Sequence, residues 1–250
     1  MTSAVRTSVG APRLAAVPAP RASVSIVIAC RDEAPTIGDI VRRCHAYSGE
    51  ILVVDGHSRD ETREVAERAG ARVLLDGRRG KGDAVRVGLQ QATGDIVVFI
   101  DADGSHDPDD IPRLVQPLLE DRADLVVASR MRGGSDEFHG DLGEIVRMIG
   151  GAIITAGINY RFGVKLSDAQ NGFRAIRAEA ARGLGLVEDI TTIEQEMVIK
   201  ALRRGLRVSE VPSHEYARSH GESRIQLGDV WHRYVYSWLK NLAARRDGPR

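Results

Sequence analysis

Short apolar runs alternate with amphipathic segments along the first half of the chain. The runs are rich in Val and Ile, which predicts buried strands, and the segments between them carry apolar residues at helical spacing. The predicted strands cover residues 24–29, 51–54, 72–75, 96–100 and 124–128, and helices are expected to begin near residues 35, 60, 81 and 108. This alternation predicts an α/β protein with a doubly wound, mostly parallel sheet flanked by helices.

The alternation stops after the fifth predicted strand. An apolar stretch over residues 145–158 contains Arg147 and is too short to cross a bilayer, which predicts an amphipathic or buried helix. A helix near 193–204 and a strand near 206–211 follow. The last predicted helix, 231–242, carries Trp and Tyr on one stripe and basic residues beyond it. Such a helix suits contact with a membrane surface, with the rest of the protein or with a second subunit.

Three segments are predicted from these patterns. Residues 1–22 are rich in Ala, Pro and Arg, which is typical of a disordered tail. Residues 23–226 form one continuous domain with two functional halves, and residues 227–250 form the aromatic and basic helix with its tail.

Paired acids at the end of the most apolar run are the strongest chemical signal. Asp101 and Asp103 follow the predicted strand 96–100, so both are expected at the sheet edge where open α/β sheets bind ligands. Two carboxylates at that edge suit Mg²⁺, which completes its coordination with phosphates and water. The alternative is a loop of surface acids, since Asp107 and Asp109 nearby are also typical of a first helical turn.

Polar residues follow two further strands at the same predicted edge, Arg31 and Glu33 after the first and Asp55 after the second. Carboxylates there can accept hydrogen bonds from a base and a ribose. The segment Gly80-Lys81-Gly82 would add backbone N–H groups and a cation for an anion, although it is also an ordinary turn before a helix. The spacings of a Walker loop and of a dinucleotide-binding glycine motif are both missing. His57 and His106 lie beside these positions, as loop residues or as functional groups.

Composition narrows the possible partners. The chain has 35 Lys and Arg against 35 Asp and Glu, so no basic field argues for nucleic acid. Cys30 and Cys44 have neither a metal-binding spacing nor a disulfide framework, which favours a reducing compartment. We therefore expect a cytoplasmic protein, either free or peripheral at the cytoplasmic face of a membrane.

Several short motifs occur along about residues 23 to 226. They are Ser25-Ile-Val-Ile-Ala-Cys-Arg-Asp-Glu33, Val53-Val-Asp-Gly-His-Ser-Arg-Asp-Glu-Thr62, Arg79-Gly-Lys-Gly-Asp-Ala-Val-Arg86, Asp101-Ala-Asp-Gly104, Asp168-Ala-Gln-Asn-Gly-Phe-Arg174, Ile193-Glu-Gln-Glu-Met197, Glu210-Val-Pro212 and Gly221-Glu-Ser-Arg224. In residues and in order they resemble the motifs of inverting family-2 glycosyltransferases with the Rossmann-like GT-A fold, and in particular those of the polyprenyl-phosphate and dolichyl-phosphate hexosyltransferases.

The resemblance implies transfer of a hexose from a nucleotide sugar to a lipid phosphate, with Mg²⁺ or Mn²⁺ and with inversion. By matching motifs, the residues expected to bind the nucleotide are Ala29, Arg31, Glu33 and Asp55, with Lys81 and Asp83 on its base or ribose side. Asp101, Ala102 and Asp103 would bind the metal and the diphosphate, and the two acids would be its ligands. The positions matching Arg130 and Arg218 contact acceptor or donor phosphates and are expected to act in catalysis.

An acceptor phosphate needs cations, because Arg binds phosphate through paired hydrogen bonds. The second half is expected to bind the acceptor through Arg130, Asp168, Gln170, Arg174, Glu194, Arg218 and Arg224. The arginines are alternatively solvated surface residues. A phosphate acceptor needs no general base, since its second pKa is about 6. A hydroxyl acceptor would need one. Asp168 and Glu194 are then the candidates, unless they orient arginines.

Two departures from the family pattern bear on specificity. Gly56 stands where many relatives have a second acid, and Ser105 stands where the mannosyl branch has Gln. The signatures around Lys81 and Arg174 resemble the glucosyl and N-acetylhexosaminyl branch, which favours a UDP-sugar over GDP-mannose. A glycosyltransferase with a soluble acceptor and a non-catalytic nucleotide-sugar-binding subunit remain as alternatives. A membrane partner protein and a homo-oligomer are further possibilities.

Overall fold

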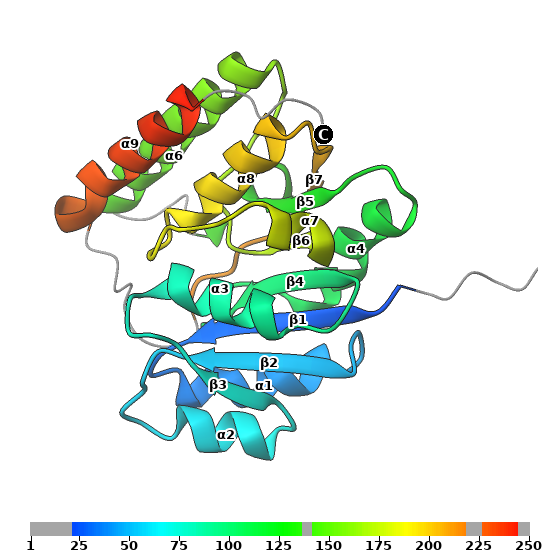
Figure 1. Ribbon diagram of the computed structural model, residues 1–250. Helices are drawn as coiled ribbons and strands as arrows, with labels where there is room; N and C mark the ends of the chain where they lie inside the picture. Colours follow the sequence, from blue (N-terminus) through cyan, green and yellow to red (C-terminus); the bar gives the residue numbers. More distant parts are fainter. Residues whose placement is uncertain (1–21, 137–141, 219–226, 245–250) are drawn as a thin grey trace, which may run out of the picture.

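A single sheet with helices on both faces is the framework of the protein (Figure 1). The computed structural model describes residues 22–136, 142–218 and 227–244. In this part of the chain the sheet has seven strands in the order β3-β2-β1-β4-β6-β5-β7. The strands are β1 Val24–Cys30, β2 Glu50–Asp55, β3 Arg72–Leu75, β4 Ile96–Asp101, β5 Leu125–Ser129, β6 Arg174–Arg177 and β7 Val208–Pro212.

The predicted strands and helices are confirmed, with boundaries shifted by a few residues. The helices of the described residues are α1 Ala34–Cys44, α2 Thr62–Arg68, α3 Lys81–Gln91, η1 Pro108–Asp110, α4 Ile111–Leu119, α5 Arg130–Gly133, α6 Leu142–Phe162, α7 Ala178–Gly183, α8 Ile193–Arg203 and α9 Leu227–Ala243. The strand β6 was not predicted. It lies antiparallel between β4 and β5, so the sheet is mostly rather than wholly parallel.

Two apolar layers cover the faces of the sheet, because successive strand residues point to opposite sides. On one face Ile26 and Ile28 pack with the buried stripes of α1, α2 and α4. On the other face Val27 packs with α3, α6, α7 and α8, and with Trp238 of α9. The sheet is therefore buried on both sides, and its strand ends are the places left for a site.

The parallel strands β1, β2 and β4 end together. Cys30 of β1 pairs in register with Asp55 of β2, and Ala29 pairs with Asp101 of β4. The C-terminal ends of parallel strands meet at one edge, as the sequence predicted. This register brings the polar residues after three separate strands to the same rim of the sheet.

Helices α6 and α9 lie side by side against the upper end of the sheet (Figure 1). The helix α6 is longer than the predicted 145–158. The helix predicted for 231–242 is confirmed, and its residues Tyr234, Trp238 and Leu242 pack on the domain core. Packing on the domain thus accounts for one side of α9. None of the described helices is long and apolar enough to span a membrane.

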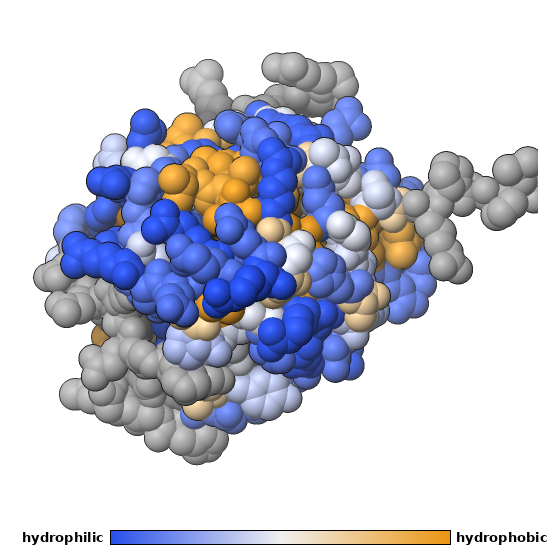
Figure 2. Space-filling view, turned by 90° about the horizontal axis from the view of Figure 1, so that it is seen from below, coloured by the Kyte–Doolittle hydropathy of each residue, from blue (hydrophilic) through white to orange (hydrophobic). Residues whose placement is uncertain are grey.

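The opposite end of the sheet is formed by β3, an edge strand that pairs only with β2 among the described strands. Figure 2 shows the molecule from below, where hydrophobic residues are confined to limited areas among hydrophilic ones. Large exposed apolar side chains gather instead on the two long helices, where they are Val146, Ile149, Ile153, Tyr160, Trp231, Val235, Tyr236 and Leu239.

A glycine makes the close packing of α9 on α6 possible. A Cβ added at Gly157 would lie 2.1 Å from Cζ2 of Trp238, whereas one added at Gly150 of the same helix meets nothing within 4 Å. We expect Gly157→Ala to destabilise the protein by about 1–3 kcal/mol, because the indole must move. Gly150→Ala should be neutral or stabilising through helix propensity. Urea unfolding and tryptophan emission would measure this; equal stabilities would contradict it.

Candidate active site

One large cleft opens at the rim where the strands end. Its volume is about 1310 Å³, large enough for a nucleotide sugar together with part of an acceptor. Both halves of the chain line it, and its wall includes Ala29 of β1 and Arg31 and Glu33 after that strand. The lining also comes from the β2 and β4 ends, the start of α3, Arg130, α6, the loop 167–172, α8, residues 215 and 218, and α9.

Asp101 is held at the rim by two cationic or polar neighbours. Its Oδ1 lies 2.6 Å from Nζ of Lys81, and its Oδ2 lies 3.8 Å from Nε2 of His106. Burial alone would raise the pKa of Asp101, but Lys81 and then His106 outweigh it and hold that pKa below its usual value. Asp101 is therefore a carboxylate at neutral pH.

Asp103 lies two residues further along the same rim. Its Oδ1 accepts hydrogen bonds from the backbone N–H of Ser105 at 3.0 Å and from the Ser105 hydroxyl at 2.6 Å. Its Oδ2 lies 2.9 Å from Nη2 of Arg218. Ser105 thus binds the neighbouring acid and orients it.

The two acids suit a divalent cation of the magnesium type. Within the described residues no group of three His, Cys, Asp or Glu side chains converges to hold a metal. Asp101 and Asp103 both line the cleft. Two carboxylates with the remaining positions left to phosphate and water are the usual donor set for Mg²⁺. The residues therefore fit the predicted metal.

The role predicted for Asp55 needs correction. Its side chain is fully buried and accepts a hydrogen bond from the backbone N–H of Ser58 at 3.0 Å, besides bonding the Ser58 hydroxyl. Asp55 therefore shapes the turn after β2 and does not face the cleft. Gly56, His57 and Ser58 of that turn line the cleft instead. The buried position follows from the register, since Asp55 is still part of the strand.

Near the turn after β2 the cleft is also lined by Asp76, which the sequence reasoning missed. His57 has a φ of +61° and places its Nε2 2.9 Å from the backbone oxygen of Asp76. The sequence did carry a signal for Asp76, because this acid directly follows the third predicted strand, which ends at the same edge of the sheet. Arg78 completes this part of the wall.

Lys81 is the charged residue of the Gly80-Lys81-Gly82 segment, and it lines the cleft. Of the backbone N–H groups expected to bind an anion, that of Gly82 is already engaged, because it donates to the carbonyl oxygen of Asp189 at 2.8 Å, as the amide of Asp83 does at 3.3 Å. The Asp83 carboxylate is buried behind the wall, accepts from the Gly77 N–H at 2.6 Å and pairs with Arg86 at 2.9 Å. Its predicted contact with the nucleotide is therefore wrong.

In the second half Arg130 is oriented by Asp168. The guanidinium donates from Nε to Oδ2 at 2.6 Å and from Nη2 to Oδ1 at 3.1 Å, and its Nη1 lies 3.5 Å from Glu215. Burial alone would raise the pKa of Asp168, but Arg130 keeps it below its usual value. Asp168 therefore orients an arginine, which is one of the roles predicted for it. Gln170 also lines the cleft and donates to Gln195 at 3.2 Å.

Arg174 is not available to an acceptor, which corrects its predicted role. It is only 1% exposed, and its guanidinium donates to the backbone oxygens of Asn171 at 3.1 Å and Glu194 at 2.8 Å. Burial lowers its pKa from the usual arginine value. Arg174 therefore ties the start of α8 to the loop before β6. Arg224 lies outside the described residues, whereas Arg218 lines the cleft.

An apolar wall on the acceptor side is the second feature that sequence reasoning missed. The helix α6 contributes Val146, Met148, Ile153 and Ile154, and α9 contributes Trp231, Tyr234, Val235 and Trp238. The sequence analysis identified the aromatic stripe of α9 but did not place the apolar residues of α6 beside it. Its place beside the cleft depends on the packing of α9 against α6, for which the sequence carries no local signal.

Comparison with known proteins identifies the family. Residues 25–185 match the model for glycosyl transferase family 2. Glycosyltransferase AglJ of Haloferax volcanii is 33% identical over 208 residues, which are 82% of this chain and 66% of that protein. The undecaprenyl-phosphate mannosyltransferase of Micrococcus luteus is 32% identical over 218 residues, which cover 80% of this chain and 86% of that protein.

Solved structures agree on the fold. Glucosyl-3-phosphoglycerate synthase of Mycobacterium tuberculosis, in complex with Mn²⁺, UDP and glucosyl-3-phosphoglycerate, superposes with a TM-score of 0.71. The sequence identity is 24%, and the match covers 91% of this chain and 82% of that one. The predicted GT-A fold is thus confirmed, and with the match over residues 25–185 the chain belongs to glycosyl transferase family 2.

Proposed function

We propose that this glycosyltransferase transfers a hexose from a nucleotide sugar to the phosphate of a polyprenyl phosphate, with inversion at the anomeric carbon. The observation that carries the proposal is the make-up of one cleft. Two carboxylates that suit a metal, Asp101 and Asp103, share it with an oriented Arg130 and with the apolar wall of α6 and α9.

The donor would lie along the ends of β1, β2 and β4. Mg²⁺ or Mn²⁺ bound by Asp101 and Asp103 would neutralise charge on the departing nucleoside diphosphate. Lys81 and Arg218 add cations at the same place. The M. tuberculosis synthase binds Mn²⁺ and UDP, which supports this reading. We retain a UDP-sugar as the preferred donor and GDP-mannose as the alternative.

The acceptor phosphate would meet Arg130 and attack without a base. A phosphate monoester is largely a dianion at neutral pH, because its second pKa is about 6. One of its oxygens forms the bond to the anomeric carbon while the bond to the diphosphate breaks, and the electron pair leaves with the diphosphate. Asp168 is a poor base, because both of its oxygens accept hydrogen bonds from Arg130.

The apolar wall favours a lipid chain over a small soluble acceptor. Val146, Ile153, Trp231 and Val235 line the cleft and are also exposed, so apolar surface continues outward from the acceptor side. Burying such surface against a polyprenyl chain is favourable. The M. luteus relative is named for undecaprenyl phosphate. Contact with a membrane, a membrane partner and a cytoplasmic location stay predictions.

The direct test incubates purified protein with Mn²⁺, a short polyprenyl phosphate and a panel of UDP- and GDP-sugars. Release of nucleoside diphosphate identifies the donor, and labelled sugar extracted into organic solvent identifies a lipid product. Product that stays in water with 3-phosphoglycerate as acceptor would instead indicate a soluble phosphate substrate. Absence of release with every sugar would refute the proposal.

A variant at the outer end of the wall should separate lipid binding from catalysis. Trp231 lines the cleft and is 58% exposed, whereas Tyr236 of the same helix is 67% exposed and lies away from the cleft lining. Trp231→Ser should raise KM for polyprenyl phosphate about tenfold, the effect of losing one large apolar contact, and leave KM for the donor unchanged. Tyr236→Ser should change neither constant. Steady-state kinetics with each substrate varied would show this.

A further inference from the structure

We propose that Glu194 is a positioning residue that retains the Lys81 ammonium when a divalent cation takes Asp101, a role that rests on the function proposed above. In this way helix α8, on the acceptor side, would set the metal affinity of the donor side. The role differs from those that the sequence suggested for Glu194, which were acceptor binding, general base and orientation of an arginine.

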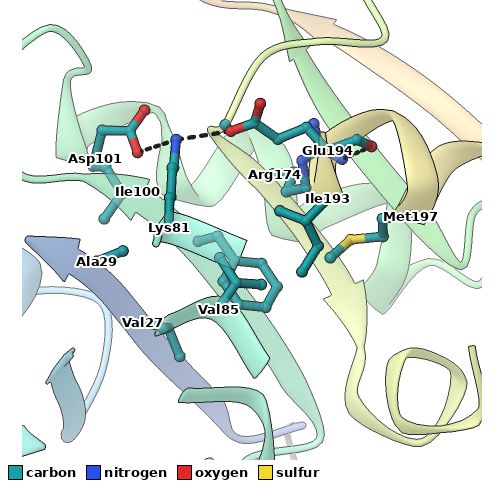
Figure 3. A pocket seen from close by; sticks show the side chains of 12 residues that line it. Val27, Ala29, Lys81, Val85, Ile100, Asp101, Arg174, Ile193, Glu194 and Met197 are labelled. Carbon is teal, nitrogen blue, oxygen red and sulfur yellow. Dashed lines mark hydrogen bonds and ion pairs between the residues drawn. The ribbon is translucent and has the colours of Figure 1, made fainter. Parts of the chain in front are cut away.

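The arrangement around Lys81 is the starting observation (Figure 3). The ammonium lies between two carboxylates, with Nζ 2.6 Å from Oδ1 of Asp101 and 2.7 Å from Oε1 of Glu194. The three side chains come from α3, β4 and α8. The Lys81 ammonium therefore links Asp101, a predicted metal ligand, to Glu194 in the second half of the chain.

Gly172 leaves the space in which these groups meet. A Cβ added there would lie 2.7 Å from Nζ of Lys81, 2.8 Å from Oδ2 of Asp101 and 3.2 Å from Oε1 of Glu194. A small cavity of about 10 Å³, lined mostly by apolar side chains, borders the same three residues. A side chain at position 172 would therefore collide with the ammonium and with both carboxylates.

The charges of these three side chains determine how the site responds to a bound divalent cation. A divalent cation and the ammonium would compete for the same carboxylate and repel each other at close range. Lys81 and Glu194 are mostly buried, with side-chain exposures of 25% and 10%. A buried ammonium without a partner is costly. Because Glu194 already binds Nζ, the ammonium can leave Asp101 and keep a charged partner.

Other contacts of Glu194 fit this role. Its backbone oxygen accepts from Nη1 of Arg174 at 2.8 Å, which fixes the start of α8. The Glu194 carboxylate points towards the Lys81 ammonium, which lies 2.7 Å from its Oε1.

Binding of Mn²⁺ alone to the full-length protein, followed by electron paramagnetic resonance, tests the inference without turnover. Glu194→Gln should weaken Mn²⁺ binding about tenfold, because the displaced ammonium then has only a neutral partner. Lys81→Met should tighten Mn²⁺ binding, since the competing cation is gone. In the Lys81→Met background, Glu194→Gln should change the affinity less than about threefold.

Glu196→Gln is the matched control. Glu196 lies on the same helix, is fully buried and pairs with Lys200 at 2.7 Å. This variant should be less stable than the wild type but bind Mn²⁺ with the same affinity. If the loss of any buried charge on this helix weakened Mn²⁺ binding, the Glu196→Gln variant would also bind Mn²⁺ more weakly.

Two results would overturn the inference. Either Glu194→Gln leaves the affinity for Mn²⁺ unchanged, or it weakens binding equally with and without Lys81, in which case Glu194 acts on the metal directly. Should Glu194→Gln fail to fold, unchanged or weaker Mn²⁺ binding by Lys81→Met overturns it as well. If the wild type binds no Mn²⁺, with or without UDP, the proposed function fails too.

Discussion

Replacing Asp103 by Asn should reduce hexosyl transfer by about 10³-fold or more, because the site loses a ligand of the charge-neutralising metal. The carboxylate lines the cleft, and its two oxygens are oriented by Ser105 and Arg218. An amide keeps the shape of the side chain but offers the metal a single neutral oxygen. The loss should appear in kcat at saturating donor and in Mn²⁺ binding.

Asp109 supplies the matched control for this experiment. It lies in the segment that follows the same strand, but its side chain is 63% exposed and pairs with Arg43 at 3.0 Å. Asp109→Asn should keep transfer within about twofold of the wild type, because surface ion pairs contribute little. Equal losses in the two variants would contradict the assignment of Asp103 to the metal.

Replacing Arg130 by Lys should lower kcat/KM for the acceptor about 10²-fold, with a smaller effect on KM for the donor. The guanidinium uses two nitrogens to bind Asp168 and keeps N–H donors for a phosphate. An ammonium is a point charge and cannot hold both partners in a fixed plane. Lysine retains the positive charge beside the buried Asp168, so the fold should survive.

Arg132, two residues along, is the control for this second substitution. Its side chain is 54% exposed and lies 3.9 Å from Glu210. Arg132→Lys should leave acceptor kinetics unchanged. Removing the charge altogether with Arg130→Met should instead destabilise the protein by about 3–5 kcal/mol, because Asp168 would be buried without a partner. A stable Arg130→Met protein with normal acceptor kinetics would exclude the proposed role.

The apolar runs were sufficient to predict most of the sheet. Strands such as β4, with Ile96 to Ile100 buried on both faces, have no other stable environment. The strand β6 was not predicted, because Arg174-Ala-Ile-Arg177 has only two apolar residues between charged ends. Its place in the sheet depends on pairing with β4 and β5, which lie far away in the sequence.

The candidate site was predictable as a location but less so as a set of contacts. Strand ends indicate which residues reach the rim, and Asp101, Asp103 and Arg130 are found there. Strand ends do not indicate the direction in which a side chain points. Asp55, Asp83 and Arg174 were therefore predicted to bind ligands, although their side chains are buried. The amide of Gly82 was likewise satisfied by a carbonyl 107 positions away, at Asp189.

The reversed direction of β6 has a consequence for the geometry of transfer. Phe99 of β4 pairs with Arg174 at the beginning of β6, so the chain passes the catalytic rim before it enters this strand. The loop with Asp168 and Gly172 thereby arrives beside Asp101 at the end of β4, although the two segments lie far apart in the sequence. A slip of two residues in this one pairing would shift Asp168 and Gly172 by about 7 Å relative to Asp101, so the shape of the cleft depends on a strand only four residues long.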